Sequence, residues 1–216
     1  MPTYTSLLFD LDGTLTDPAL GITTAVAYAV EKMGFAPPPR EKLLHYIGPP
    51  LKDTFMQDYH LSPAEGDRAV TLYREYFAPR GLFENQVYPG IPELLAALKA
   101  RGIWIALATS KPEVFAQKIL DHFDMSQYFD EIVGSELDGR RVKKAEVVAE
   151  VLSRCPTPDR ALMVGDRFHD VEGAHQNHLP AAGVLYGYGS REEMEEHKAD
   201  FILETVADLS VFLLEG

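Results

Sequence analysis

The segment Phe9-Asp10-Leu11-Asp12-Gly13 constrains this chain most, because it places two carboxylates two residues apart where an apolar run ends. The preceding run, Ser6-Leu7-Leu8-Phe9, has apolar residues on both faces, as is typical of a central parallel strand covered by helices. In a strand Asp10 and Asp12 share one face, and open α/β sheets bind ligands beyond the carboxyl ends of their strands. The segment therefore predicts a ligand site at the end of this strand.

Two neighbouring carboxylates resist joint ionisation unless a cation neutralises them. Magnesium suits such a pair, because it accepts carboxylate and carbonyl oxygens and keeps waters that a phosphate can displace. The segment alone also fits a plain solvated turn. Residues further along the chain decide between the two interpretations.

A second buried strand is predicted from Trp104 to Ala108, and it ends in Thr109-Ser110-Lys111-Pro112. The proline suits the first turn of a helix. A hydroxyl at Thr109 or Ser110 can donate to a phosphate oxygen, and the helix N-terminus adds backbone donors. The alternative is that these hydroxyls simply cap the helix.

Two more segments follow the same design. Residues 140–144, Arg-Arg-Val-Lys-Lys, open an amphipathic helix. The helix dipole disfavours cations at this end, which favours an anionic partner, and a merely solvated surface run is the alternative. The apolar strand Ala161 to Val164 leads into Gly165-Asp166 and, four residues later, Asp170. These two aspartates share a face if the chain turns helical, although an acidic helix start has the same pattern.

Together, the DxDGT segment, the hydroxyl residues after a strand, the lysine and the GDxxxD segment resemble the haloacid dehalogenase superfamily. The resemblance covers essentially the whole chain and is to the aspartate-nucleophile phosphohydrolases, specifically the phosphoglycolate-phosphatase-like group with a helical cap. One departure is that Lys143-Lys144-Ala145 stands where Lys-Pro is common. This leaves the acting lysine open, and we favour Lys144 because it occupies the position just before the usual proline.

The resemblance implies an α/β fold, a doubly wound parallel sheet with an inserted α-helical cap. We expect the core domain in residues 1–16 and 88–216 and the cap in residues 17–87, where the strand signal gives way to helical periodicity. Core strands are expected at Ser6 to Asp10, Trp104 to Thr109, Glu131 to Val133, Leu162 to Gly165, Ala182 to Leu185 and Phe201-Ile202.

The resemblance also implies a role for each motif residue. Asp10 would be the nucleophile that forms an aspartyl-phosphate, and Asp12 the acid and base that serves the leaving alcohol and then the attacking water. The remaining expected roles are phosphoryl or substrate binding by Thr109, Lys144, Gly13 and Ser110, and binding of a Mg²⁺ cofactor by Asp10, Asp12 (through its backbone carbonyl), Asp166 and, at the edge, Asp170.

Substrate choice is expected to come from the cap. In the loop Ile47 to Lys52, Gly48 allows close backbone approach and Lys52 can meet a substrate carboxylate. The alternative is that the two prolines simply start a helix at Leu51. The expected substrate is a small-molecule phosphomonoester such as 2-phosphoglycolate. Nucleoside monophosphates, phosphotyrosine and a sugar phosphomutase reaction are the alternatives, and retention of Asp10, Asp12, Lys144 and Asp166 argues against a non-catalytic regulator.

The chain is acidic, with 33 Asp and Glu against 20 Lys and Arg and a formal charge of −13. This balance argues against nucleic acid or an anionic membrane as the main partner. There is no membrane-length apolar stretch or signal sequence, and the single cysteine, Cys155, rules out an intramolecular disulfide. We expect a cytoplasmic enzyme that is a monomer or homodimer.

Overall fold

The computed structural model describes residues 4–215. Its main element is a six-stranded sheet in the order β5-β4-β1-β6-β7-β8, and every neighbouring pair of strands is parallel. The predicted α/β class is therefore confirmed. The strands are β1 (Ser6–Phe9), β4 (Trp104–Pro112), β5 (Glu131–Ser135), β6 (Ala161–Gly165), β7 (Ala181–Val184) and β8 (Phe201–Leu203).

All six predicted core strands are present, with ends shifted by one or two residues except at β4. That strand runs on to Pro112, and its register against β5 shifts between Ala108 and Pro112. Pro112 keeps an extended ψ of 127° and is the N-cap of α5 (Glu113–His122), so the prediction that it enters the first helical turn is wrong. The segment after Thr109 thus continues as extended chain.

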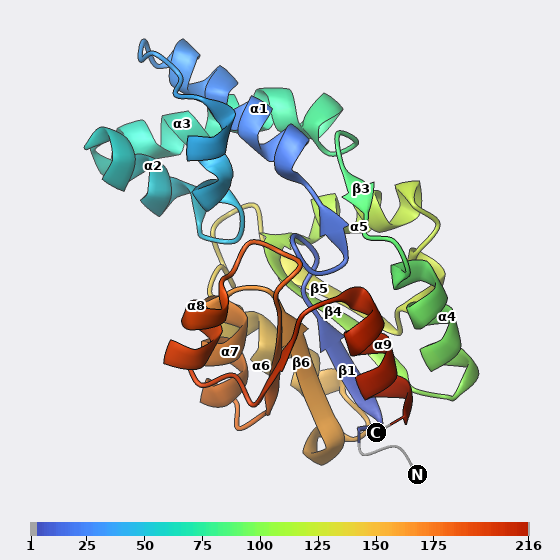
Figure 1. Ribbon diagram of the computed structural model, residues 1–216. Coiled ribbons are helices and arrows are strands. Elements are labelled where there is room, and N and C mark those ends of the chain that lie inside the picture. The colour runs from blue at the N-terminus through green and yellow to red at the C-terminus, as the bar shows by residue number, and fades with distance from the viewer. Residues whose placement is uncertain (1–3, 216) are drawn as a thin grey trace. The chain divides into compact units, whose positions relative to one another are not determined.

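Helices cover both faces of the sheet (Figure 1). On one face α6 (Lys144–Arg154), α7 (Phe168–Gln176) and α8 (Arg191–Glu196) pack on side chains such as Leu8, Ala106 and Met163, which are all fully buried. The other face is covered by α4 (Ile91–Ala100), α5 and α9 (Val206–Glu215). Burial on both faces explains why the central strands read as continuous apolar runs.

The strand order reverses direction at β1. From β1 the chain moves outward through β4 to β5, and then crosses to the other side of β1 to form β6, β7 and β8. In open α/β sheets such a switch point leaves a crevice beyond the carboxyl ends of the adjacent strands. Asp10 follows β1 and Asp166 follows β6, so both residues lie at this edge.

A second compact unit comprises residues 18–86, while residues 1–17 and 87–216 form the first unit. The chain passes between the units at β2 (Thr16–Asp17) and β3 (Gln86–Val87), which pair in a two-stranded sheet. The second unit consists of α1 (Ala19–Lys32), the 3₁₀ segment η1 (Arg40–Tyr46), α2 (Leu51–Tyr59), α3 (Pro63–Tyr76) and the π-helical turn η2 (Phe77–Gly81).

Local sequence explains the helices of this second unit. Ile22, Val26 and Val30 are buried along one side of α1, as their spacing predicts. The start of α3 is a capping box, in which Ser62 accepts a hydrogen bond from the Glu65 N–H and the Glu65 carboxylate accepts one from the Ser62 N–H. The segment η1 is a 3₁₀ helix rather than an α-helix.

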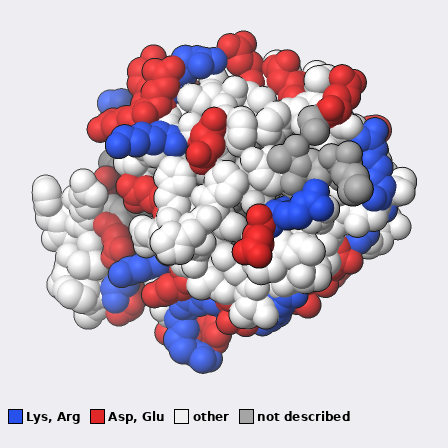
Figure 2. Space-filling model, turned by 90° about the horizontal axis from the view of Figure 1, so that it is seen from below, with Lys and Arg blue, Asp and Glu red and all other residues white. Residues whose placement is uncertain are grey.

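Charged side chains of both signs are interspersed on the surface in Figure 2, with no continuous basic patch on the face shown. This fits the acidic composition, because a nucleic-acid-binding face needs clustered Lys and Arg. Within residues 4–215, every helix is too short or too polar to cross a bilayer.

Candidate active site

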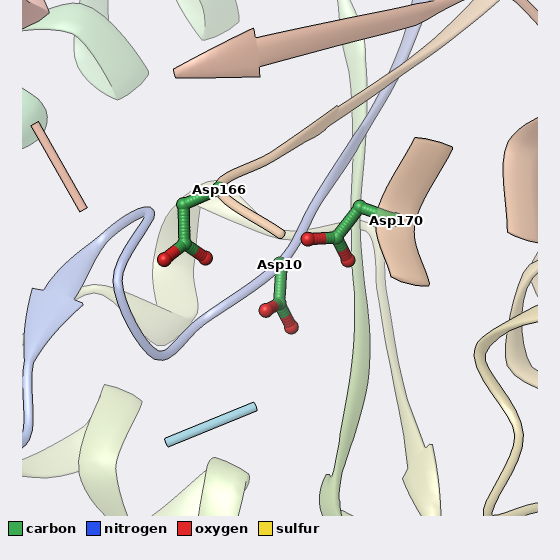
Figure 3. Close-up of side chains that lie close together, drawn as sticks. All are labelled: Asp10, Asp166 and Asp170. Atoms are coloured by element: carbon green, nitrogen blue, oxygen red, sulfur yellow. The ribbon is translucent and has the colours of Figure 1, made fainter. Parts of the chain in front are cut away.

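Three aspartates converge at the switch point of the sheet (Figure 3). Asp10 comes from the end of β1, Asp166 from the end of β6 and Asp170 from the first turn of α7. One carboxylate oxygen from each lies within 4.8 Å of the others, and all three residues are buried. Residues 156 and 160 positions apart in sequence (Asp10 with Asp166 and with Asp170) are thus brought together by the parallel sheet.

The turn after Asp10 is built so that Asp166 can approach it. Gly13 has a φ of +86°, and a Cβ added there would lie 2.0 Å from Asp166 Oδ2. The N–H of Gly13 donates to the Thr16 carbonyl at 2.7 Å, and the Leu11 carbonyl accepts from Leu15 at 2.9 Å. Only glycine fits this position, because a side chain would have both the wrong backbone conformation and a collision with Asp166.

Hydrogen bonds fix the carboxyl groups of Asp166 and Asp170. Asp170 Oδ2 accepts from the Arg167 N–H at 3.0 Å and so caps the start of α7. Asp166 Oδ2 accepts from the Tyr188 N–H at 2.8 Å, and its Oδ1 accepts from the Thr14 hydroxyl at 3.3 Å. Both carboxyl groups are therefore held in one orientation.

Lys144 is the cation that the structure places among these acids. Its Nζ lies 2.7 Å from Asp10 Oδ1 and 2.8 Å from Asp170 Oδ1, and it donates to the Ala108 carbonyl at 2.9 Å. The preceding lysine, Lys143, is the exposed N-cap residue of α6. Burial thus separates the two adjacent lysines, and Lys144 is the one directed at the carboxylates.

One lysine does not neutralise three acids. Burial, followed by the charges of Asp170 and Asp10, raises the pKa of Asp166 well above its ordinary value. Burial also raises the pKa of Asp170, to about 6, although Lys144 opposes the shift. Burial alone would lower the pKa of Lys144, but the carboxylates of Asp10 and Asp170 outweigh this and raise it. The cluster thus retains excess negative charge that a further cation would relieve.

The donor atoms suit a hard divalent cation. Asp10 Oδ1 and Asp170 Oδ1 are buried and accept no hydrogen bond from any described residue, although Lys144 lies beside both. Every group in the cluster offers carboxylate oxygen, which magnesium and calcium prefer to nitrogen or sulfur ligands. The residues present therefore fit a hard divalent cation such as magnesium or calcium.

Asp12 forms an ion pair with a second buried lysine, Lys111. Lys111 Nζ donates to Asp12 Oδ1 at 2.7 Å, and their side chains are only 6% and 10% exposed. Burial raises the pKa of Asp12, whereas the nearby Lys111 lowers it. No role was predicted for Lys111 from the sequence, although it lies only two residues after Thr109.

The loop after β7 also forms part of the site and was not predicted. The Tyr186 hydroxyl donates to the Thr14 carbonyl at 2.9 Å, and the Tyr188 hydroxyl donates to the Asp17 carboxylate. A Cβ at Gly187 would lie 2.3 Å from the Gly13 carbonyl. The glycines around Tyr188 therefore allow this loop to pack directly behind the turn after Asp10.

The other predicted residues lie as follows. Thr109 is buried at the end of the apolar part of β4, and its hydroxyl accepts from the Lys111 N–H at 3.2 Å. Ser110 is the next residue and is half-buried. Lys52 belongs to the second unit, where its Nζ lies 2.7 Å from Asp67. Pro50 is the N-cap of α2, so the prolines do start the helix at Leu51, and Gly48 has a φ of +103°.

Comparison with known proteins identifies the family of this chain. Residues 7–184 match the family model described as haloacid dehalogenase-like hydrolase. A "5'-nucleotidase" of Pseudomonas aeruginosa is 48% identical over 90% of this chain and 89% of its own length. A "Phosphoglycolate phosphatase" of Aquifex aeolicus is 31% identical over 94% of this chain and 93% of its own length.

Two further relatives extend the comparison. The crystal structure of a predicted phosphatase from Clostridium acetobutylicum superposes with a TM-score of 0.95 at 44% identity and covers 99% of both chains. "Tyrosine-protein kinase PtkA" of Mycobacterium tuberculosis is 40% identical over 92% of this chain, which spans 65% of that longer protein. The family model and the phosphoglycolate phosphatase relative confirm the predicted resemblance, and the chain is a phosphatase that belongs to the haloacid dehalogenase-like hydrolase family.

Proposed function

We propose that this enzyme is a magnesium-dependent phosphatase that hydrolyses a small-molecule phosphomonoester through an aspartyl-phosphate on Asp10. The observation that carries the proposal is the buried cluster of Asp10, Asp166, Asp170 and Lys144 at the switch point of the sheet. A nucleophilic carboxylate, a candidate cation site and a lysine for phosphate oxygens meet there. This is the set that phosphoryl transfer needs, since its catalysis is mainly positioning and charge stabilisation.

Magnesium would be held by the carboxylates of Asp10 and Asp166 and the backbone carbonyl of Asp12, with Asp170 at the edge. When bound, it would supply charge that offsets the repulsion between the Asp10 carboxylate and an anionic phosphate. Asp170 keeps a second task, because the same carboxyl group faces Lys144 and caps α7. It would therefore orient the lysine as well as the metal site.

The chain's own residues would carry out two displacements. In the first, a carboxylate oxygen of Asp10 forms a bond to phosphorus, the bond from phosphorus to the ester oxygen breaks, and Asp12 gives that oxygen a proton. In the second, Asp12 takes a proton from water, whose oxygen attacks phosphorus and releases phosphate and the Asp10 carboxylate. Lys144, Thr109, Ser110 and the backbone at Gly13 would bind the phosphoryl oxygens.

The helical unit would act as the cap that selects the substrate. We assign the core to residues 1–16 and 88–216 and the cap to residues 17–87, within a residue of the division between the two compact units. The Gly48 loop and Lys52 would contribute to selection. Lys52 is more than one-third exposed, so its ion pair with Asp67 is weak and leaves the ammonium group open to exchange partners.

Two substrate classes have direct support. The phosphoglycolate phosphatase relatives favour a small phosphorylated acid such as 2-phosphoglycolate. The 48% identical 5'-nucleotidase favours a nucleoside 5'-monophosphate, and this higher identity makes nucleotides the first class to test. Phosphotyrosine and a sugar phosphomutase reaction remain alternatives with the same first chemical step.

The test is a panel of phosphomonoesters assayed with magnesium. It would contain 2-phosphoglycolate, nucleoside 5'-monophosphates, phosphotyrosine, a sugar phosphate and p-nitrophenyl phosphate, and it would measure free phosphate and isomerised sugar phosphate separately. We expect phosphate release that disappears with a chelator and returns with magnesium. Isomerised sugar phosphate as the main product would replace the phosphatase assignment with a mutase, and full activity in chelator would remove the metal from the proposal.

A further inference from the structure

A buried ion pair links two motifs that the proposed mechanism treats separately. Lys111 Nζ lies 2.7 Å from Asp12 Oδ1, and 99 residues separate the two in sequence. Both side chains are at least nine-tenths buried. A buried lysine is costly unless paired, and its Coulomb attraction to a carboxylate is stronger away from water. The contact therefore fixes where the Asp12 carboxyl group lies.

Contacts of the backbone around Lys111 fix the position from which its side chain reaches Asp12. The Lys111 N–H donates to the Thr109 hydroxyl at 3.2 Å, in the part of β4 where the register shifts. A Cβ at Gly134 would lie 2.5 Å from the Lys111 carbonyl oxygen, so the neighbouring strand β5 needs a glycine there. The extended end of β4, which the sequence did not predict, is thus held from two sides.

The site divides its carboxylates between two lysines. Lys144 faces Asp10 and Asp170, the proposed nucleophile and the metal-site edge. Lys111 faces Asp12, the proposed acid and base. With its own cation, Asp12 is oriented independently of the group that attacks phosphorus, so the two functions can be lost separately.

We propose that Lys111 is a positioning residue for the leaving-group step, holding the Asp12 carboxyl group where it can give its proton to the departing alcohol. The inference rests on the proposed function. As the bond from Asp10 to phosphorus forms and the ester bond breaks, the proton of Asp12 passes to the ester oxygen. This leaves a neutral alcohol and an Asp12 carboxylate, which the Lys111 ammonium group retains in place for the later reaction with water.

The test is to measure how the loss of kcat/KM caused by Lys111→Met depends on the leaving group of the substrate. An alkyl phosphate, such as a nucleoside 5'-monophosphate or 2-phosphoglycolate, needs a proton on its leaving oxygen, whereas p-nitrophenyl phosphate does not. We expect kcat/KM to fall about ten- to a hundredfold more for the alkyl ester, within the range of a lost general acid. Because kcat/KM covers steps up to alcohol release, the later hydrolysis of the intermediate does not enter the comparison.

Three controls sharpen the result. Lys118→Met removes an exposed lysine of α5 and should leave both substrates unaffected. Lys111→Arg keeps a cation and should bring the ratio of kcat/KM for the alkyl ester to kcat/KM for the aryl ester back toward that of the unmodified enzyme. If Lys111→Met does not fold, Lys111→Gln takes its place in the comparison with Lys111→Arg. In an Asp12→Asn background, Lys111→Met should lower kcat/KM for the alkyl ester by a further factor of less than about three, because the carboxyl group that Lys111 positions is no longer there.

An equal loss for alkyl and aryl esters, or an undiminished loss in the Asp12→Asn background, overturns the inference and makes Lys111 a phosphate-binding or purely structural residue. Failure of the proposed function looks different. In that case the unmodified enzyme releases no phosphate from any ester in the panel, or Asp10→Asn stays active, whatever the Lys111 variants do.

Discussion

Two groups of charged residues, one in each compact unit, differ sharply in burial. At the carboxyl ends of β1 and β6, Asp10, Asp166 and Lys144 are buried. In the helical unit, the ion pair of Lys52 with Asp67 is exposed, with side chains 38% and 66% accessible. Buried charges have fixed partners and large effects when removed, whereas exposed pairs contribute little. The difference predicts that chemistry resides in the first unit and discrimination in the second.

The strongest way to break this comparison is Asp10→Asn. The amide keeps the shape of the side chain but removes the nucleophile and one charge that faces Lys144, so we expect turnover to disappear while the fold is retained. Phosphate release and circular dichroism would be measured together. Appreciable turnover by the folded variant would rule out Asp10 as the nucleophile.

The two adjacent lysines give a matched pair. Neighbouring helical residues project about 100° apart, and only Lys144 is buried among the carboxylates. Lys144→Ala should therefore lower kcat by about two to four powers of ten, comparable to losing a preorganised transition-state donor. Lys143→Ala, at the exposed N-cap, should cost far less. The opposite ranking in steady-state assays would transfer the catalytic role to Lys143.

Asp166→Asn should mainly impair the use of magnesium, because the proposed site would lose an anionic ligand. We expect a higher magnesium concentration for half-maximal activity and a lower maximal rate, measured by titrating the metal at saturating substrate. Asp67→Asn, an exposed aspartate of the helical unit, is the control and should leave the metal titration unchanged. An unaltered titration curve for Asp166→Asn would remove this residue from the metal site.

The smallest effects are expected in the helical unit. Lys52→Ala, or replacement of Gly48-Pro49-Pro50, should change the relative kcat/KM among phosphomonoesters without abolishing hydrolysis of p-nitrophenyl phosphate. Lys42→Ala, at another exposed position of this unit, should leave the ranking of substrates unaltered. A uniform loss across all substrates, or none, would count against the loop as a specificity element.

The sequence predicted the sheet well because buried parallel strands are continuous apolar runs. Leu7 to Phe9 and Leu162 to Val164 are buried, and the first run is followed directly by Asp10 and the second, after Gly165, by Asp166. The position of a functional residue at a strand end can therefore be predicted from local sequence. Because the strands are parallel, residues at their carboxyl ends lie at the same edge of the sheet.

Features that depend on contacts between distant segments escaped prediction. The pairing of Lys111 with Asp12 needs both the extended end of β4 and the turn after β1. The lack of a side chain at Gly187 is explained by the approach of the Gly13 carbonyl, which belongs to a distant part of the sequence. Neither contact produces a periodic pattern in the local sequence from which it could be predicted.

The stereochemical course at phosphorus tests the central claim most directly. A thiophosphate ester made chiral with one oxygen isotope would be hydrolysed in water enriched in another, and the configuration of the thiophosphate product would be determined. Two successive in-line displacements, first by Asp10 and then by water, each invert phosphorus, so the account predicts net retention. Net inversion would show a single displacement by water and would contradict a covalent aspartyl-phosphate.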